Sequence, residues 1–147
     1  AAGATPRITL TSDSRVRGIA TSGWRGRSHS RGIADSVTVL ATTAAQADVA
    51  ATLIANAVDL RDHPAIHRVR ACDLAPDSDL GARLVTVNVG ALAPEDIARA
   101  LDAGARYAAH CLSRGHIIAA YLYLGETYRV IGAPEHLTQP EKDRLHA

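Results

Sequence analysis

Three short polar side chains recur every four residues in an alanine-rich stretch of this chain, at Asp48, Thr52 and Asn56. On an α-helix this spacing places them on one face, because residues four apart are turned by only about 40°. The simplest interpretation is a stripe that faces solvent, although such stripes normally carry Lys, Glu or Arg. A carboxylate and a hydroxyl one turn apart also suit Mg²⁺, which prefers oxygen ligands. The spacing alone leaves a solvated face and a cation site both open.

A second group of polar residues lies in residues 22–32, where serine, arginine and glycine alternate without apolar periodicity. This pattern predicts a loop. Arginine binds phosphate or carboxylate in a bidentate way, and backbone amides beside glycine add further donors. The residues that we assign to such an anion site are Gly23, Arg25, Arg27 and Ser28. A solvated basic loop fits the same composition equally well.

The same loop offers a different chemistry through His29, which lies between two serines. An imidazole there could act as an acid or base, and Asp35 could orient it or cap a turn. Ser22 or Thr21 would then be the nucleophile of a hydrolase that acts on a small amide or ester. The chain has no nucleophile-elbow motif, so the spacing does not demand this arrangement.

The bulk composition limits the classes of protein to consider. A chain of 147 residues with 47% hydrophobic and 21% charged residues is typical of one soluble globular domain. A net charge of +1 provides no overall field that would attract nucleic acid or a membrane. No apolar run approaches the length of about 20 residues that spans a bilayer. Cys72 and Cys111 fit no metal or redox spacing, which favours reduced thiols in a cytoplasmic protein.

Hydrophobic periodicity and capping signals predict the elements that must position these residues. We expect helices from a cap at Thr42 or Thr43 to Val58, and from Pro94 to Arg114 with a possible break at Gly104. Residues 59–78 are expected to be irregular. Strands are predicted at 7–11, 16–22, 36–41 and 84–89, and a terminal hairpin at 117–124 and 127–131. A polar tail, 133–147, follows, with a short helix expected after Pro140. The order predicts an α+β fold with helices packed on a largely antiparallel sheet.

Three segments taken together resemble a known family. Residues 18–23 (GIATSG), 36–41 (SVTVLA) and 47–52 (ADVAAT) are similar, in this order, to the C-terminal half of the ApbE-type FAD:protein FMN transferase superfamily. They resemble more closely an uncharacterised ApbE-like family of bacteria and archaea, in which a TSG-x-x-G-R-S loop leads into the strand. The resemblance covers residues 8–132 and implies an ApbE-like, T-fold-like half domain over 1–132, followed by the tail.

The resemblance also implies ligands and partners. In the flavin transferases this helix supplies Mg²⁺ ligands, which here correspond to Asp48, Thr52 and the backbone carbonyl of Ala51. FAD or FMN would be the bound flavin, although only residues 28–35 stand where the transferases carry a longer H-I-I-D-P-x-T-G segment. Members of these families have an upstream half, so we expect a partner chain or the N-terminal half of the same precursor to complete the fold. We also expect an oligomer. The polypeptide alone should expose a sheet edge and apolar surface.

These observations lead to three expectations for function. The first is binding of a phosphate-bearing small molecule, such as a flavin or another nucleotide, together with Mg²⁺, in a transferase-like protein. The second is the hydrolase described above, and the third is a non-catalytic subunit. We expect no nucleic-acid or membrane partner.

Overall fold

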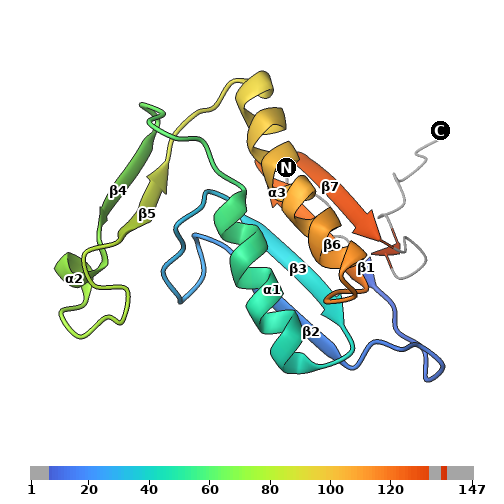
Figure 1. Cartoon of the computed structure of the whole chain (residues 1–147). Coiled ribbons are helices and arrows are strands. Elements are labelled where there is room, and N and C mark those ends of the chain that lie inside the picture. The colour runs from blue at the N-terminus through green and yellow to red at the C-terminus, as the bar shows by residue number, and fades with distance from the viewer. Residues whose placement is uncertain (1–6, 133–136, 139–147) are drawn as a thin grey trace, which may run out of the picture.

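The main sheet has four antiparallel strands, and two helices cover one of its faces. The computed structural model describes residues 7–132 and 137–138. The strands lie in the order β2 (Gly18–Ser22), β3 (Ser36–Ala41), β6 (Ala119–Leu124) and β7 (Thr127–Gly132). The helices α1 (Ala44–Ala57) and α3 (Pro94–Ser113) run in opposite directions across the same face, as Figure 1 shows. The predicted α+β class with a largely antiparallel sheet is confirmed.

Helix α1 begins where its capping signal predicts. The Thr43 side chain accepts a hydrogen bond from the Gln46 backbone N–H at 3.1 Å, which satisfies one of the donors at the helix start. Its buried face is formed mostly by alanines, so the helix approaches the sheet closely. At Gly18 in β2, an added Cβ would lie 2.2 Å from the Thr43 carbonyl oxygen. Only glycine allows this approach of strand and helix.

Helix α3 is continuous through Gly104, so the expected break there is wrong. A Cβ at this position would lie 2.3 Å from Cγ2 of Val58. The glycine therefore lets α3 pack against the residue that follows α1. Pro94 occupies the first turn of α3, as predicted, where its missing N–H has no partner to lose.

The predicted end of α3 near Arg114 is confirmed, and Gly115 completes a Schellman cap there. Gly115 adopts the left-handed conformation, with a φ of 73°. The His116 N–H donates to the Cys111 carbonyl at 2.9 Å, and the Gly115 N–H donates to the Leu112 carbonyl at 3.0 Å. The chain therefore turns back, so that His116 lies beside the last turns of the helix.

The prediction that residues 59–78 are irregular is wrong. They contain β4 (Ile66–Arg70) and the short helix α2 (Ala71–Leu74). Strand β4 pairs with β5 (Leu84–Val89) in a separate antiparallel ribbon, which extends away from the main sheet in Figure 1. Because a two-stranded ribbon leaves much of its surface in solvent, β4 carries charged and half-buried residues rather than a continuous apolar run. Because these charges interrupt the apolar periodicity, the sequence pattern predicted a loop rather than a strand.

The N-terminal segment is less extended than predicted. Strand β1 (Arg7–Ile8) is shorter than the expected 7–11 and pairs with β8 (Leu137–Thr138). The Val16 N–H donates to the Ser14 hydroxyl, so a turn replaces the start of the predicted strand at 16–22. Val16 packs on the second face of the main sheet. The short helix expected after Pro140 lies outside the described residues.

The second face of the main sheet is only partly covered. Beyond the part under Val16, the outward residues of these four strands are uncharged and include Ile19, Thr21, Ser36, Thr38, Tyr121, Tyr123, Tyr128 and Val130. Ile19 is 48% exposed and Val130 is 37% exposed. The chain thus exposes apolar surface on this face, as expected. None of the helices within 7–132 is long and apolar enough to cross a membrane.

Candidate functional site

The carboxylate of Asp35 holds the start of the loop between β2 and β3. Its Oδ1 accepts a hydrogen bond from Trp24 Nε1 at 3.2 Å and forms an ion pair with Arg25 Nε at 3.0 Å. Its Oδ2 accepts from the Gly125 backbone N–H at 2.8 Å. The Arg25 guanidinium lies over the Trp24 ring, 5.0 Å from its centroid. Asp35 therefore joins the loop to the turn between β6 and β7.

The amide of Asn56 holds the other end of this loop. Its Oδ1 accepts hydrogen bonds from the Arg31 backbone N–H at 3.0 Å and from the Ser30 hydroxyl at 3.4 Å. Gly32 lies against the last turn of α1, where an added Cβ would be 2.0 Å from the Ala55 carbonyl oxygen. The loop thus ends in contact with the backbone of α1, and glycine is required for that contact.

Between these two contacts, residues 24–31 form what we call the basic loop. Arg27, Ser28 and His29 are exposed. Within the described residues, their side chains and backbone N–H groups have no hydrogen-bond or ion-pair partner, and neither does the Arg31 guanidinium. The loop therefore presents two guanidinium groups, a hydroxyl and an imidazole beside unbonded N–H groups. These are donors that suit an anion.

The predicted metal ligands lie on α1. Asp48 and Thr52 are exposed, and the Thr52 hydroxyl donates to the Asp48 backbone carbonyl at 3.1 Å. Ala51 is 1% exposed and lies inside the regular helix, where its carbonyl is positioned to accept the N–H four residues later. Asn56, the third residue of the stripe, is bonded to the basic loop.

The donor set on α1 is therefore small for a cation. Its accessible oxygens are the Asp48 carboxylate and the Thr52 hydroxyl. In the part of the chain that the structure describes, no group of three or more His, Cys, Asp or Glu residues could hold a metal ion. Mg²⁺ is usually bound through one or two carboxylates plus waters and phosphate oxygens. These residues fit Mg²⁺ only if a phosphate-bearing ligand supplies further oxygens.

The residues predicted to carry out hydrolysis are not connected to one another by hydrogen bonds in a catalytic arrangement. The Thr21 hydroxyl is hydrogen bonded to the Thr38 hydroxyl at 2.8 Å, on the open face of the sheet. Ser22 follows it in the strand, so the two side chains point to opposite faces. Among residues 7–132, no hydrogen bond connects His29 with Thr21, Ser22 or Asp35. Both carboxylate oxygens of Asp35 have other partners.

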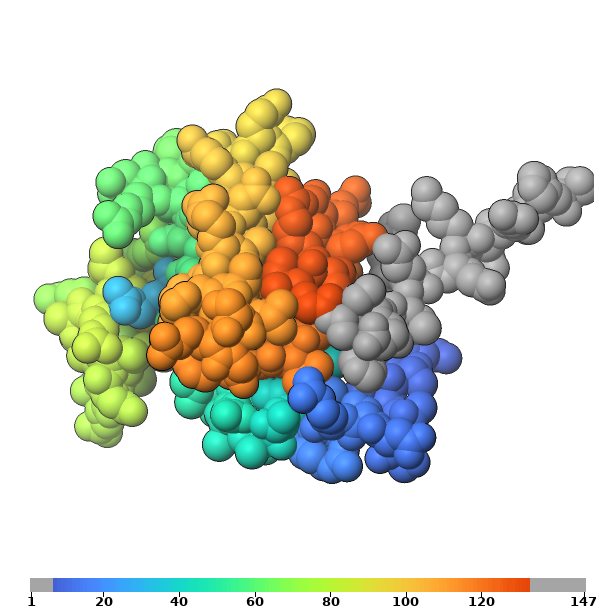
Figure 2. All heavy atoms as spheres, turned by 45° about the vertical axis from the view of Figure 1, so that its right-hand side comes forward, coloured from blue at the N-terminus to red at the C-terminus, as the bar shows by residue number. Residues whose placement is uncertain are grey.

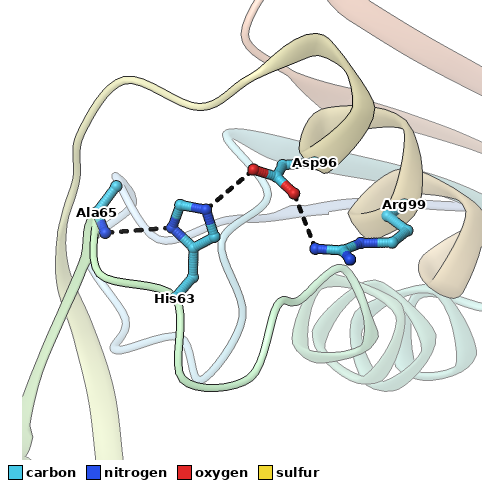
Figure 3. Close-up of polar contacts among 4 residues, drawn as sticks. All are labelled: His63, Ala65, Asp96 and Arg99. Atoms are coloured by element: carbon cyan, nitrogen blue, oxygen red, sulfur yellow. Dashed lines mark hydrogen bonds and ion pairs between the residues drawn. The ribbon is translucent and has the colours of Figure 1, made fainter.

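A histidine contact that the sequence pattern did not indicate lies at the start of α3 (Figure 3). His63 Nε2 is 3.0 Å from Asp96 Oδ2, and its Nδ1 accepts from the Ala65 N–H at 3.1 Å. Because Nδ1 accepts, Nε2 carries the hydrogen that is donated to Asp96. Arg99 donates to the other carboxylate oxygen at 2.8 Å. With both ring nitrogens bonded, His63 joins the segment before β4 to α3 rather than offering a free base.

The three segments that resemble the flavin transferases all have packing roles. Residues 18–23 form β2 and its end, residues 36–41 form β3, and residues 47–52 lie within α1. Their small and β-branched residues are those that a buried strand and a close-packed helix require. The same packing requirements can produce similar short segments in different families.

Comparison with protein families identifies a different relationship from the one expected. The chain matches the family described as "AbpE bacteria" (AbpE_bact) over residues 1–131. This family is distinct from the ApbE-type FAD:protein FMN transferases, so the expected membership in that superfamily is wrong. No curated protein and no solved structure matches the chain. The match over residues 1–131 places this chain in the AbpE bacteria family.

Proposed function

We propose that this chain binds a small phosphate-bearing molecule at the basic loop. The observation that carries the proposal is that Arg27 and Arg31 extend guanidinium groups, unpaired among the described residues, from a loop that is held at both ends. One guanidinium group can donate two parallel hydrogen bonds to the oxygens of one phosphate, and unbonded backbone N–H groups provide further donors.

The contacts at the ends of the loop favour this proposal over a merely solvated loop. Asp35 and Asn56 fix the backbone on either side of the exposed donors. Ordering a mobile loop opposes binding, because each immobilised residue loses conformational freedom. A loop that is already held loses less conformational entropy on binding. More of the free energy of its arginine–phosphate contacts then contributes to affinity.

Mg²⁺ is the cation that we propose to act with this ligand. Asp48 and Thr52 lie on the same helix face as Asn56, whose side chain contacts the basic loop. Eight residues of helix separate Asp48 from Asn56, which is about 12 Å along the axis. The protein supplies a carboxylate and a hydroxyl, and the ligand's phosphate would supply the remaining charge.

Cys72 and Cys111 are both free thiols, which suits a reducing, cytoplasmic compartment.

Calorimetric titration with ADP, FMN and FAD, each with and without Mg²⁺, tests the proposal. We expect Arg27→Gln and Arg31→Gln to weaken binding about tenfold each, since each removes a charged hydrogen bond to phosphate. Arg15→Gln is the matched control, because Arg15 is exposed and lies outside the loop. Equal affinities for the wild type and both loop variants, or no heat with any of the three ligands, would contradict the proposal.

The Mg²⁺ part has its own test in the same titrations. Asp48→Asn should remove the enhancement by Mg²⁺ and leave the affinity measured without Mg²⁺ unchanged. Asp13→Asn, an exposed aspartate outside the helix, is the control. If Asp48→Asn retains the full enhancement, the cation is bound elsewhere while the phosphate proposal stands.

The uncharged open face of the main sheet favours a second role, as a non-catalytic subunit in an oligomer. Within β2, β3, β6 and β7, the residues on this face are all uncharged, so two copies would not repel one another there. We propose a second copy of the chain as the partner. Analytical ultracentrifugation should then give a dimer that Val130→Glu dissociates. A monodisperse monomer of the wild type would contradict this role.

A further inference from the structure

A groove of about 500 Å³ lies between the first half of α1 and the second half of α3. The two helix halves meet because the helices run in opposite directions, and the end of α3 lies beside the start of α1 at the surface in Figure 2. The groove is lined by Ala45, Gln46, Val49, Ala50, Leu53, Tyr107, His110, Cys111 and His116. It is separate from the basic loop, which contacts the other end of α1.

The walls of this groove are apolar and remain in contact with solvent. Val49 and Leu53 lie one turn apart on α1 and are 59% and 44% exposed. Tyr107 on α3 is 37% exposed. Single exposed apolar side chains are common on protein surfaces, but a group of them along one groove indicates a binding surface. Ala45 and Ala50 leave room between the larger side chains.

The polar residues of the groove can donate hydrogen bonds and carry no negative charge. His110 lies near the end of α3, and the Schellman cap at Gly115 turns His116 back into the groove. Among the residues that the structure describes, no carboxylate lines the groove. Burial raises the pKa of the Cys111 thiol, which keeps that group neutral. An imidazole offers one N–H when neutral and two when protonated, so these histidines favour an anion in either state.

We propose that the groove binds a small molecule with an apolar body and an anionic head. The body lies between Val49, Leu53 and Tyr107, and the head lies against His110 and His116. A volume of about 500 Å³ is in the range of small-molecule sites, which spans about 300–1,000 Å³, and is too small for a folded partner. This site is independent of the phosphate site at the basic loop, and either can exist without the other.

Two fluorescent probes distinguish the body from the head. Anilinonaphthalene sulfonate has two aromatic groups and an anionic head, whereas phenylnaphthylamine has the same aromatic groups without the charge. In fluorescence titrations we expect Val49→Gln combined with Leu53→Gln to weaken the binding of both probes about tenfold, because the apolar walls are lost. We expect His110→Gln combined with His116→Gln to weaken the sulfonate probe about fivefold and leave the uncharged probe unchanged.

Matched controls separate the groove from the open sheet face. Val87→Gln changes an exposed valine on β5, outside the groove, and should leave both affinities unchanged. Circular dichroism checks that each variant is folded, and because Val49 and Leu53 are largely exposed, their replacement should not disturb the core. Unchanged affinities in the Val49→Gln, Leu53→Gln variant would overturn the proposal. Loss of affinity for both probes in Val130→Gln, on the sheet face, would overturn it as well. If the histidine variant weakens the binding of both probes equally, the proposal that His110 and His116 bind an anionic head is overturned.

Discussion

Asp35 accepts a hydrogen bond from the backbone N–H of Gly125, a residue 90 positions later in the chain, at 2.8 Å. The same carboxylate bonds Trp24 and Arg25 at the start of the basic loop. One side chain therefore ties this loop to the turn between β6 and β7. The position of the loop depends on the hairpin at the end of the main sheet as well as on its neighbours in sequence.

Replacing this carboxylate should destabilise the protein. Asp35→Ala leaves the Trp24 indole and the Gly125 N–H without their acceptor, and we expect unfolding to become easier by about 2 kcal/mol. Urea denaturation measures this change, and Trp24 fluorescence should shift to longer wavelength as the indole becomes more solvated. Asp13→Ala, at an exposed aspartate, should change the stability little. Equal midpoints for the two variants would show that the Asp35 contacts do not stabilise the fold.

Asn56 should control the order of the basic loop more than the stability of the whole chain. Asn56→Ala removes the acceptor for the Ser30 hydroxyl and the Arg31 N–H, so amide exchange at Arg31 should become faster. The free energy of unfolding should fall by about 1 kcal/mol. Thr52→Ala changes the preceding turn of the same helix face and is the control, because its hydroxyl bonds only within the helix. Protection that persists in Asn56→Ala would mean that other contacts hold the loop.

The contact between Gly104 and Val58 should appear as an interaction energy between two mutations. Gly104→Ala brings a Cβ to within 2.3 Å of Val58 Cγ2, and overpacking of this kind costs about 1–3 kcal/mol, partly offset by the better helix propensity of alanine. Val58→Ala alone creates a cavity and should also destabilise. In the double variant the smaller side chain makes room for the added methyl group. The combined loss of stability should therefore be smaller than the sum of the single losses. Strict additivity in urea denaturation would contradict this packing.

Tyr121 should make the protein less stable in alkali. Burial, together with Tyr128 and Tyr123, raises the pKa of the Tyr121 hydroxyl above its ordinary value of 10.0. Above pH 10.0 the unfolded chain releases this proton while the folded chain still retains it, so stability falls as pH rises through that range. Below that pH the contribution is fully present. Thermal unfolding followed from neutral to alkaline pH should show a smaller alkaline loss in Tyr121→Phe than in the wild type. An identical loss in both would assign the effect to other groups.

Local signals in the sequence were sufficient for most elements of the fold. The β-branched run in β3, the cap at Thr43, Pro94 at the start of α3 and Gly115 at its end each act within a few residues. Their effect on the backbone does not depend on distant contacts, because it comes from steric preference and from hydrogen bonds within one turn. The α+β class followed from the order of these elements.

The contacts between distant residues were decided only by the tertiary structure. Strand β4 was missed because its stabilising partner, β5, lies further along the chain and its own residues are mixed in polarity. The sequence left open whether Asp35 orients His29 or caps a turn, and folding places it against Trp24, Arg25 and Gly125. The family was misjudged for a related reason, since short segments shaped by packing resembled another family. The sequence by itself determined which segments form helices, strands and an arginine-rich loop. The packing of α1, α3 and the hairpin decided which side chains meet, because those contacts depend on how distant elements approach one another.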